Sequence, residues 1–161
     1  MPTLYLTPAS IGYITQLILS LAITVYLIGR LRKQENRSPQ TILLTAIFVV
    51  STLFVGLLFL DAASLPAPRL QIVYLENTVL GVMLVLLLQF AYRFPAYFPK
   101  CKWEAYGLLA ASLLYTLYEA LFALYRFALL LGQGRVEYRP PEADYALAAL
   151  FIWVPIVFLR Q

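Results

Sequence analysis

The feature that most constrains this chain is its series of long apolar segments. Four runs are long enough, at roughly 20 apolar residues or more, to cross the hydrocarbon core of a bilayer as a helix. With a shorter fifth run, they occupy about 11–29, 41–60, 70–91, 105–132 and 143–160. In lipid, every backbone polar group must be bonded within its own segment, which favours helices. We therefore expect an all-α polytopic membrane helical bundle of about five transmembrane helices, forming a single membrane-embedded domain over 1–161.

The fifth segment is the weakest of the series. Its apolar part, 145–159, would be roughly 22 Å long as a helix, which is marginal for a bilayer core about 30 Å thick. Pro155 interrupts the run and is expected to kink the helix. We expect either a thin last span or the first part of a helix that this chain does not complete.

Composition excludes a soluble domain and most enzyme classes. The chain is 62% hydrophobic and 12% charged, whereas soluble domains are about 45–50% apolar and about 25% charged. It has no histidine, one cysteine (Cys101) and no glycine-rich phosphate-binding loop. These absences remove histidine-based catalysis, most zinc and haem sites, and disulfide or iron–sulfur chemistry. We predict a non-enzymatic protein with no catalytic residues, no metal and no cofactor.

Basic residues indicate the orientation of the chain. The net charge of +4 could suggest nucleic acid, but eight of the 12 basic residues border hydrophobic segments on one predicted side. By the positive-inside rule that side is cytoplasmic, which places the N-terminus outside and the C-terminus inside. The eight are Arg30, Arg32, Lys33, Arg37, Arg93, Lys100, Lys102 and Arg160, and the other side holds Arg69, Arg135 and Arg139. The expected partner is the lipid bilayer, not nucleic acid.

Ionisable residues inside the spans are the functional candidates, because a charge in a membrane helix is costly and usually faces the bundle interior. On the fourth segment, positions 112, 115, 119, 122 and 126 share one helical face, which is polar except for Phe122. Helix geometry places this group in the outer half of the bilayer, together with polar residues of the second and third segments. The candidate ligand-binding, ion-binding or buried ion-pair residues are Asp61, Glu76, Tyr115, Glu119 and Arg126.

Two interpretations of this group remain open. In the functional one, an outward-facing polar cavity binds a small ligand, an ion or a proton. In the structural one, Glu76 or Glu119 pairs with Arg126 and holds the third and fourth helices together. Interhelical polar contacts in membranes contribute only about 0.6 kcal/mol on average, so stability alone is a weak reason to bury such charges.

Small and polar residues on the first two segments predict a helix–helix contact, because they let backbones approach closely. On the first segment they are Gly12, Gln16, Ser20 and Thr24, and on the second Thr41, Thr45, Ser51, Thr52 and Gly56. Trp153 is interpreted either as a lipid anchor or as a pocket wall. Cys101, between two lysines, is interpreted as an incidental interfacial cysteine, with a reactive or acylated thiol as the alternative.

Three short motifs resemble a known receptor family. They are the run from Phe90 to Pro95, the pair Tyr125–Arg126, and the pair Asp144–Tyr145. In these motifs and in helix pattern, the chain resembles the seven-helix N-terminal membrane region of bacterial histidine kinases and related cyclase or phosphatase receptors. The resemblance implies a sensory input and anchor in the bacterial inner (plasma) membrane, coupled to a cytoplasmic output domain. Five spans are present here, so either a fragment of a longer receptor or a short relative working as a subunit is expected.

Three functions are therefore considered. The first is a membrane-embedded sensory and anchor module of a bacterial signalling protein, which couples the outward-facing polar site to a cytoplasmic output domain or partner. The second is a non-catalytic integral subunit of a larger membrane complex, in contact with other membrane chains. The third is a small ion- or proton-coupled transporter with Glu119 as the coupling residue. Whether the chain forms a homodimer is left open.

Overall fold

The computed structural model describes residues 7–34, 38–63, 66–94, 101–131 and 142–160. Within these residues the chain is helical, with no strand. The helices are α1 (Pro8–Lys33), α2 (Pro39–Ala63), α3 (Pro66–Arg93), α4 (Lys102–Leu131) and α5 (Glu142–Leu159). The all-α prediction is confirmed, and each long helix extends by a few residues beyond its predicted apolar run at one or both ends.

Four helices of the described part are long and apolar enough to cross a membrane: α1, α2, the part of α3 from Ile72 to Arg93 and the part of α4 from Lys102 to Phe127. The apolar part of α5, Ala143–Leu159, is shorter. Pro155 lies inside α5, which continues through it as a helix. The fifth predicted span is thus a helix, but one below the length of the other four.

Polar side chains and prolines set the starts of the first two helices. Thr7 accepts a hydrogen bond from the Ser10 backbone N–H, and the Ser10 hydroxyl accepts one from the Thr7 N–H, forming a capping box. At α2 the Ser38 hydroxyl accepts a bond from the Thr41 N–H, and Pro39 is the first helical residue. Proline suits this first position because the first helical residue needs no backbone donor partner.

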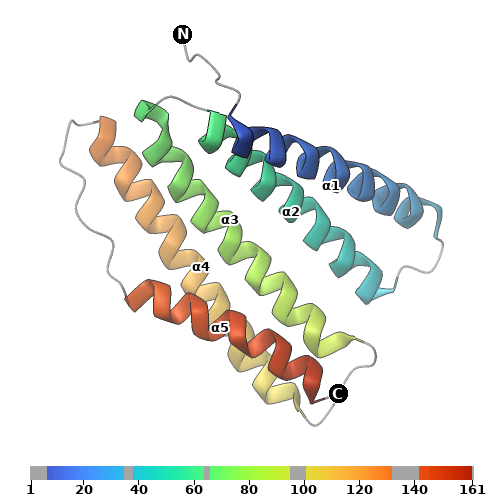
Figure 1. The fold of residues 1–161 in the computed structure, drawn as a ribbon. Coiled ribbons are helices and arrows are strands. Elements are labelled where there is room, and N and C mark those ends of the chain that lie inside the picture. Colours follow the sequence, from blue (N-terminus) through green and yellow to red (C-terminus); the bar gives the residue numbers. More distant parts are fainter. Residues whose placement is uncertain (1–6, 35–37, 64–65, 95–100, 132–141, 161) are drawn as a thin grey trace.

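The four long helices form an open row (Figure 1). In the picture α1, α2, α3 and α4 lie side by side in chain order, and α5 crosses α3 and α4 obliquely. The substantial helix–helix contacts are α1 with α2, α2 with α3, α3 with α4, and α5 with α3 and α4. Because the row does not close on itself, only 6% of the most apolar part of α1, and the same share of α2, is buried within the chain.

Hydroxyl groups join α1 to α2. The Ser20 and Thr52 hydroxyl oxygens lie 2.7 Å apart, and those of Thr24 and Thr52 lie 2.9 Å apart. Thr24 also donates to the backbone carbonyl of Phe48 across the interface at 3.1 Å. The predicted contact is therefore confirmed for Ser20 and Thr24, whereas Gly12 and Gln16 of the same stripe are exposed. The exposed pair lies nearer the start of α1, where the stripe does not meet α2.

Replacing Thr52 with valine is expected to weaken this contact slightly. The change removes the hydroxyl shared by Ser20 and Thr24 at almost constant volume, and should cost about 0.6–1.7 kcal/mol. Thermal or SDS-induced unfolding in detergent micelles measures it. Thr15→Val is the matched control, because the exposed Thr15 hydroxyl bonds only to Ile11 of its own helix; an equal loss in both variants would contradict the prediction.

α3 and α4 are in close contact at Gly81. A Cβ atom placed there would lie 3.0 Å from Thr116 Oγ1 and 3.4 Å from Thr116 Cα. Ordinary carbon contacts in proteins are about 3.5–4.0 Å, so the two helices approach as they do because residue 81 has no side chain. Gly81 is buried in this interface.

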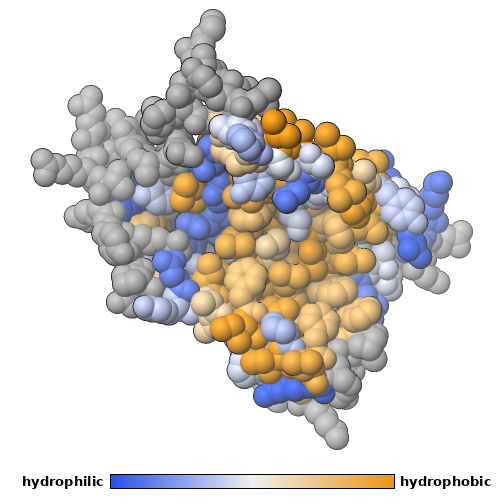
Figure 2. All heavy atoms as spheres, in the orientation of Figure 1, coloured by the Kyte–Doolittle hydropathy of each residue, from blue (hydrophilic) through white to orange (hydrophobic). Residues whose placement is uncertain are grey.

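The surface has apolar and basic regions that match a membrane protein. Figure 2 shows hydrophobic residues across the middle of the visible face and hydrophilic residues toward its rims. At one end of the row, called the basic end, lie Arg30, Arg32, Lys33, Arg93, Lys102 and Arg160. Of the other predicted topology residues, Arg37, Lys100, Arg135, Arg139 and the side chain of Arg69 lie outside the described part. The assignment of the basic end to the cytoplasm stays a prediction from charge.

Candidate functional site

The predicted polar face of α4 is the buried face of that helix. Ser112 is fully buried, Glu119 and Arg126 each expose 2% of their surface, and Tyr115 exposes 8%. The residues between them, such as Leu114 and Leu117, are exposed. The spacing therefore predicted correctly which side of α4 turns toward the rest of the protein.

Arg126 lies over an aromatic ring that belongs to a small aromatic group. Its guanidinium carbon lies 4.8 Å from the centre of the Phe122 ring, one turn earlier on α4. The Phe122 ring meets Tyr74 of α3 edge-on at 6.0 Å and stacks with Tyr118 at the same distance. A buried guanidinium over a ring face is held by the ring's negative potential, which is worth about 2 kcal/mol or more when water is excluded. Phe122, the apolar member of the predicted face, is thus part of the arginine's environment.

Glu76 of α3 and Asp61 of α2 form the second part of the candidate group. The two carboxylates are close enough to interact electrostatically. Glu76 Oε1 is buried and has no hydrogen-bond partner among the described residues. A buried carboxylate oxygen without a donor is costly, and a proton, a cation or a donor group on a ligand would satisfy it.

The five predicted residues thus come from three helices, and they lie between the middle of the row and the end opposite the basic end. Tyr115, Glu119 and Arg126 lie on α4, Glu76 on α3 and Asp61 near the end of α2. The Tyr74–Phe122 ring contact joins α3 to α4 at this level. No group of three or more aspartate, glutamate, cysteine or histidine side chains in the described residues has the arrangement of a metal site.

A second polar cluster, at the basic end, was missed by the sequence analysis. We call it the Glu104 junction, and it joins α3, α4 and α5. Glu104 Oε1 accepts hydrogen bonds from the Tyr92 hydroxyl at 2.7 Å, from Trp153 Nε1 at 3.3 Å and from the Arg160 guanidinium at 3.1 Å. The Arg160 guanidinium also lies over the Trp153 ring, 5.3 Å from its centre.

One sequence signal for the junction was available. Glu104 lies in the first turn of α4, where a carboxylate is favoured by the helix dipole, but its partners are 12, 49 and 56 residues away. Trp153, which was interpreted as either a lipid anchor or a pocket wall, is an interhelical hydrogen-bond donor. The separations explain the omission, because no helical periodicity relates residues on different helices.

An apolar layer supports the junction. Ala91, Tyr92 and Val157 form a buried cluster, and Trp153, Cys101 and Ala105 pack against it with other partly buried residues. Cys101 is partly buried here, beside the ends of α3 and α5. The cysteine is therefore placed to report whether α5 is in contact with α3 and α4.

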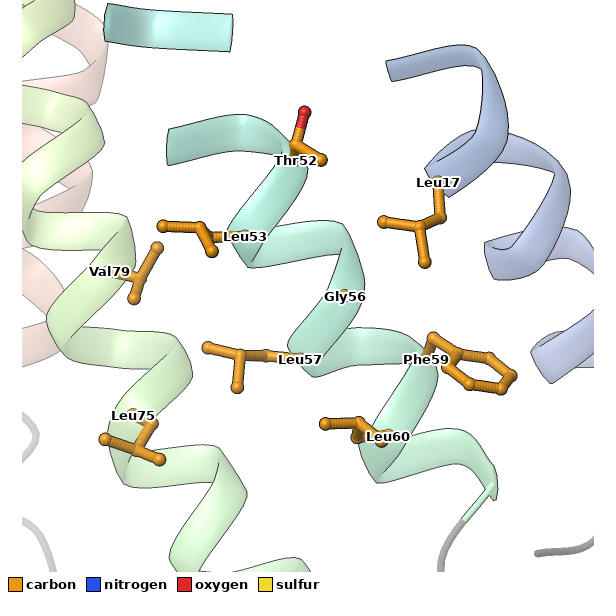
Figure 3. A pocket seen from close by; sticks show the side chains of 9 residues that line it. All are labelled: Leu17, Thr52, Leu53, Gly56, Leu57, Phe59, Leu60, Leu75 and Val79. Atoms are coloured by element: carbon orange, nitrogen blue, oxygen red, sulfur yellow. The ribbon is translucent and has the colours of Figure 1, made fainter. Parts of the chain in front are cut away.

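An apolar hollow lies over α2. Figure 3 shows Leu53 and Leu57 of α2 pointing toward Val79 and Leu75 of α3, with Leu17 of α1 on the other side of Gly56. Its volume is about 610 Å³. It is lined by Leu17, Thr52, Leu53, Gly56, Leu57, Phe59, Leu60, Leu75 and Val79. With no charged residue in its wall, this groove carries none of the candidate chemistry.

Comparison with protein-family models, with curated proteins and with solved structures finds no match to this chain. The resemblance to the membrane regions of sensory kinases accordingly stays a prediction.

Proposed function

We propose that this protein is a membrane-embedded sensory and anchor module of a bacterial signalling protein, placed in the inner membrane. In this proposal an outward-facing polar site on α2, α3 and α4 is coupled to a cytoplasmic output domain or partner. The observation that carries it is that one helix, α4, holds an interacting polar group toward each end: a buried one at Glu119 and Arg126, and a partly buried one at Glu104. Glu119 and Arg126 are buried in the half of α4 away from the basic end, and Glu104 bonds to α5 at the basic end.

The rigidity of α4 supports the coupling. Glu104 and Glu119 are separated by about 22 Å along an α-helix, and a continuous helix transmits a shift or rotation over that length without a chain of side-chain rearrangements. A proton, cation or donor group that bound near the unsatisfied Glu76 oxygen would change the packing of α3 against α4. The Glu104 junction would then favour one of two positions of α5.

Coupling between the Glu119 site and the Glu104 junction can be measured even though the ligand is not identified. Cys101 is the only cysteine of the chain, so the rate at which a maleimide labels it reports the state of the junction. We expect Glu119→Gln to change this rate about fivefold or more, as a coupling free energy of about 1 kcal/mol predicts. Cys101 and Glu119 are about 27 Å apart along the helix, so a changed labelling rate cannot come from direct contact between the two side chains.

Tyr118→Phe is the matched control, because Tyr118 lies next to Glu119 but is exposed. It should leave the labelling rate unchanged. Circular dichroism and size exclusion in detergent establish that both variants are folded. A folded Glu119→Gln variant that labels at the wild-type rate would leave the buried charges with a structural role only, and would remove the sensory proposal.

A second candidate, a non-catalytic subunit of a larger membrane complex, is favoured by the open row of helices. α1 packs substantially only against α2 among the described residues, and its remaining face exposes Ile18, Leu19, Val25 and Tyr26. Helices of partner proteins would cover such a face. Co-purification with the same larger membrane proteins at fixed stoichiometry would favour this candidate, and a stable monomer or dimer in mild detergent would favour the first.

A further inference from the structure

A small pocket lies between the end of α3 and the start of α4, on the basic end of the row. Its volume is about 40 Å³, close to that of a single small group. It is lined by Gln89, Tyr92, Arg93, Lys102, Ala105 and Tyr106. Neither polar cluster described above uses this pocket, although Tyr92 borders both it and the Glu104 junction.

The pocket is rich in hydrogen-bond donors and positive charge. Arg93 and Lys102 contribute two cations, and the Lys102 ammonium lies 5.9 Å from the centre of the Tyr106 ring. Gln89 Nε2, also from a lining residue, is a buried donor with no hydrogen-bond partner among the described residues. Buried donors are almost always bonded in folded proteins, so this amide indicates a missing acceptor.

The Glu104 carboxylate does not cancel the charge. Glu104 lies in the same first turn of α4, but its Oε1 accepts bonds from Tyr92, Trp153 and Arg160. It is thereby paired with the Arg160 cation on the α5 side. An anion at the pocket would therefore meet two cations, with the unpartnered Gln89 amide in the pocket wall, while the adjacent Glu104 carboxylate is already paired with Arg160.

We propose that this pocket binds a phosphate group, supplied either by the headgroup of an anionic phospholipid or by free phosphate. Arg93 ends α3 and Lys102 begins α4, so the site lies at the level where a membrane-spanning helix meets the headgroups. Basic pockets between membrane helices are suited to anionic headgroups, because each Lys or Arg near the surface attracts the headgroup's negative charge. Arginine can bind a phosphate through two parallel hydrogen bonds, and lysine adds a compact charge.

A second basic hollow on the same end provides a contrast. It is lined by Tyr26, Gly29, Arg30, Lys33 and Gln34 of the first helix and its C-cap. It also has two cations, but the buried unsatisfied atom there is Gln34 Oε1, an acceptor. An acceptor opposes an anion, so this hollow has the charge of the proposed site without its donor.

Native mass spectrometry of the protein with phosphatidylglycerol and phosphatidylcholine tests the lipid source. We expect one phosphatidylglycerol to bind preferentially, and Arg93→Gln with Lys102→Gln to weaken it about tenfold or more. Gln89→Leu, which keeps size and charge, should weaken it about fivefold or more, as the loss of a hydrogen bond to a charged group predicts. Arg30→Gln with Lys33→Gln removes the same amount of charge on α1, which is two helix spacings from the pocket and beyond the screening length. This double variant should change binding by no more than about twofold.

Phosphorus-31 line broadening of inorganic phosphate by the delipidated protein tests the other source. If phosphate broadens with the wild-type protein and the broadening is lost in Gln89→Leu, the site binds free phosphate. If the wild-type protein causes no broadening but binds phosphatidylglycerol selectively, the site binds a lipid headgroup. Equal weakening by both double variants, with Gln89→Leu like the wild type, would show general charge attraction and overturn the proposal. The double variants replace exposed side chains and are expected to fold. If Gln89→Leu is unstable, the comparison between the two double variants still tests the proposal.

Discussion

Replacing Gly81 with leucine is expected to lower the free energy of unfolding by about 3 kcal/mol, the upper end of the usual cost of overpacking. Even a single Cβ there would lie 3.4 Å from the backbone Cα of Thr116 and 3.0 Å from its hydroxyl oxygen. A leucine would force α3 and α4 apart along their whole contact. Since the candidate site is built on this contact, the Tyr74–Phe122 ring pair should separate as well.

Thermal and SDS-induced unfolding in detergent measure the loss, with Gly107→Leu as the matched control. Gly107 is likewise a glycine inside a helix, in this case α4, but it is exposed and a Cβ there meets nothing within 4 Å. Leucine at that position should stabilise the helix by about 0.8 kcal/mol through its higher propensity. A Gly81→Leu protein as stable as the wild type would mean that the two helices are not in this contact.

Replacing Trp153 with alanine is expected to raise the rate of maleimide labelling at Cys101 about tenfold or more, which corresponds to about 1.4 kcal/mol of lost docking free energy. The change removes the ring that packs on the Ala91–Tyr92–Val157 cluster. It also removes the N–H that donates to Tyr92 and Glu104. With α5 held less firmly, the partly buried thiol becomes accessible for a larger fraction of the time.

A charge effect on the thiol can be separated from this opening. Arg160→Gln removes a positive charge and should slow labelling if charge alone acted, because the thiolate is the reacting form. By weakening the bond to Glu104 it should instead speed labelling about two- to threefold, as expected for a half-exposed ion pair. Lys102→Gln leaves the Glu104 junction intact and should only slow it. Trp153→Ala labelling at the wild-type rate would contradict the junction as the contact that holds α5.

The helices and the inward face of α4 were predictable because each depends on one segment at a time. Apolar length indicates a span without reference to the rest of the chain. The three- and four-residue steps among Tyr115, Glu119 and Arg126 define a face by local geometry. These residues are buried because a charged side chain facing lipid would be costly. Whether they bind a ligand stays a prediction.

The partners of each face were not predictable in the same way. The stripe on α1 indicated a helix contact, but only Ser20 and Thr24 meet α2, while Gln16 is exposed. Trp153 was open to two interpretations until its donor bonds to Tyr92 and Glu104 were known. Such contacts depend on how two helices cross, and the sequence of one segment does not determine that geometry.

By itself, the sequence determined the class of the protein: apolar length, a few clustered charges and basic residues at one end specify a membrane-embedded helical chain. Only the tertiary structure decided that the helices lie in an open row and that Glu104 joins three of them. It also placed the unsatisfied Gln89 amide near two cations. The reason is that hydrophobicity acts on each segment separately, whereas hydrogen bonds and close packing require atoms from distant segments at fixed positions.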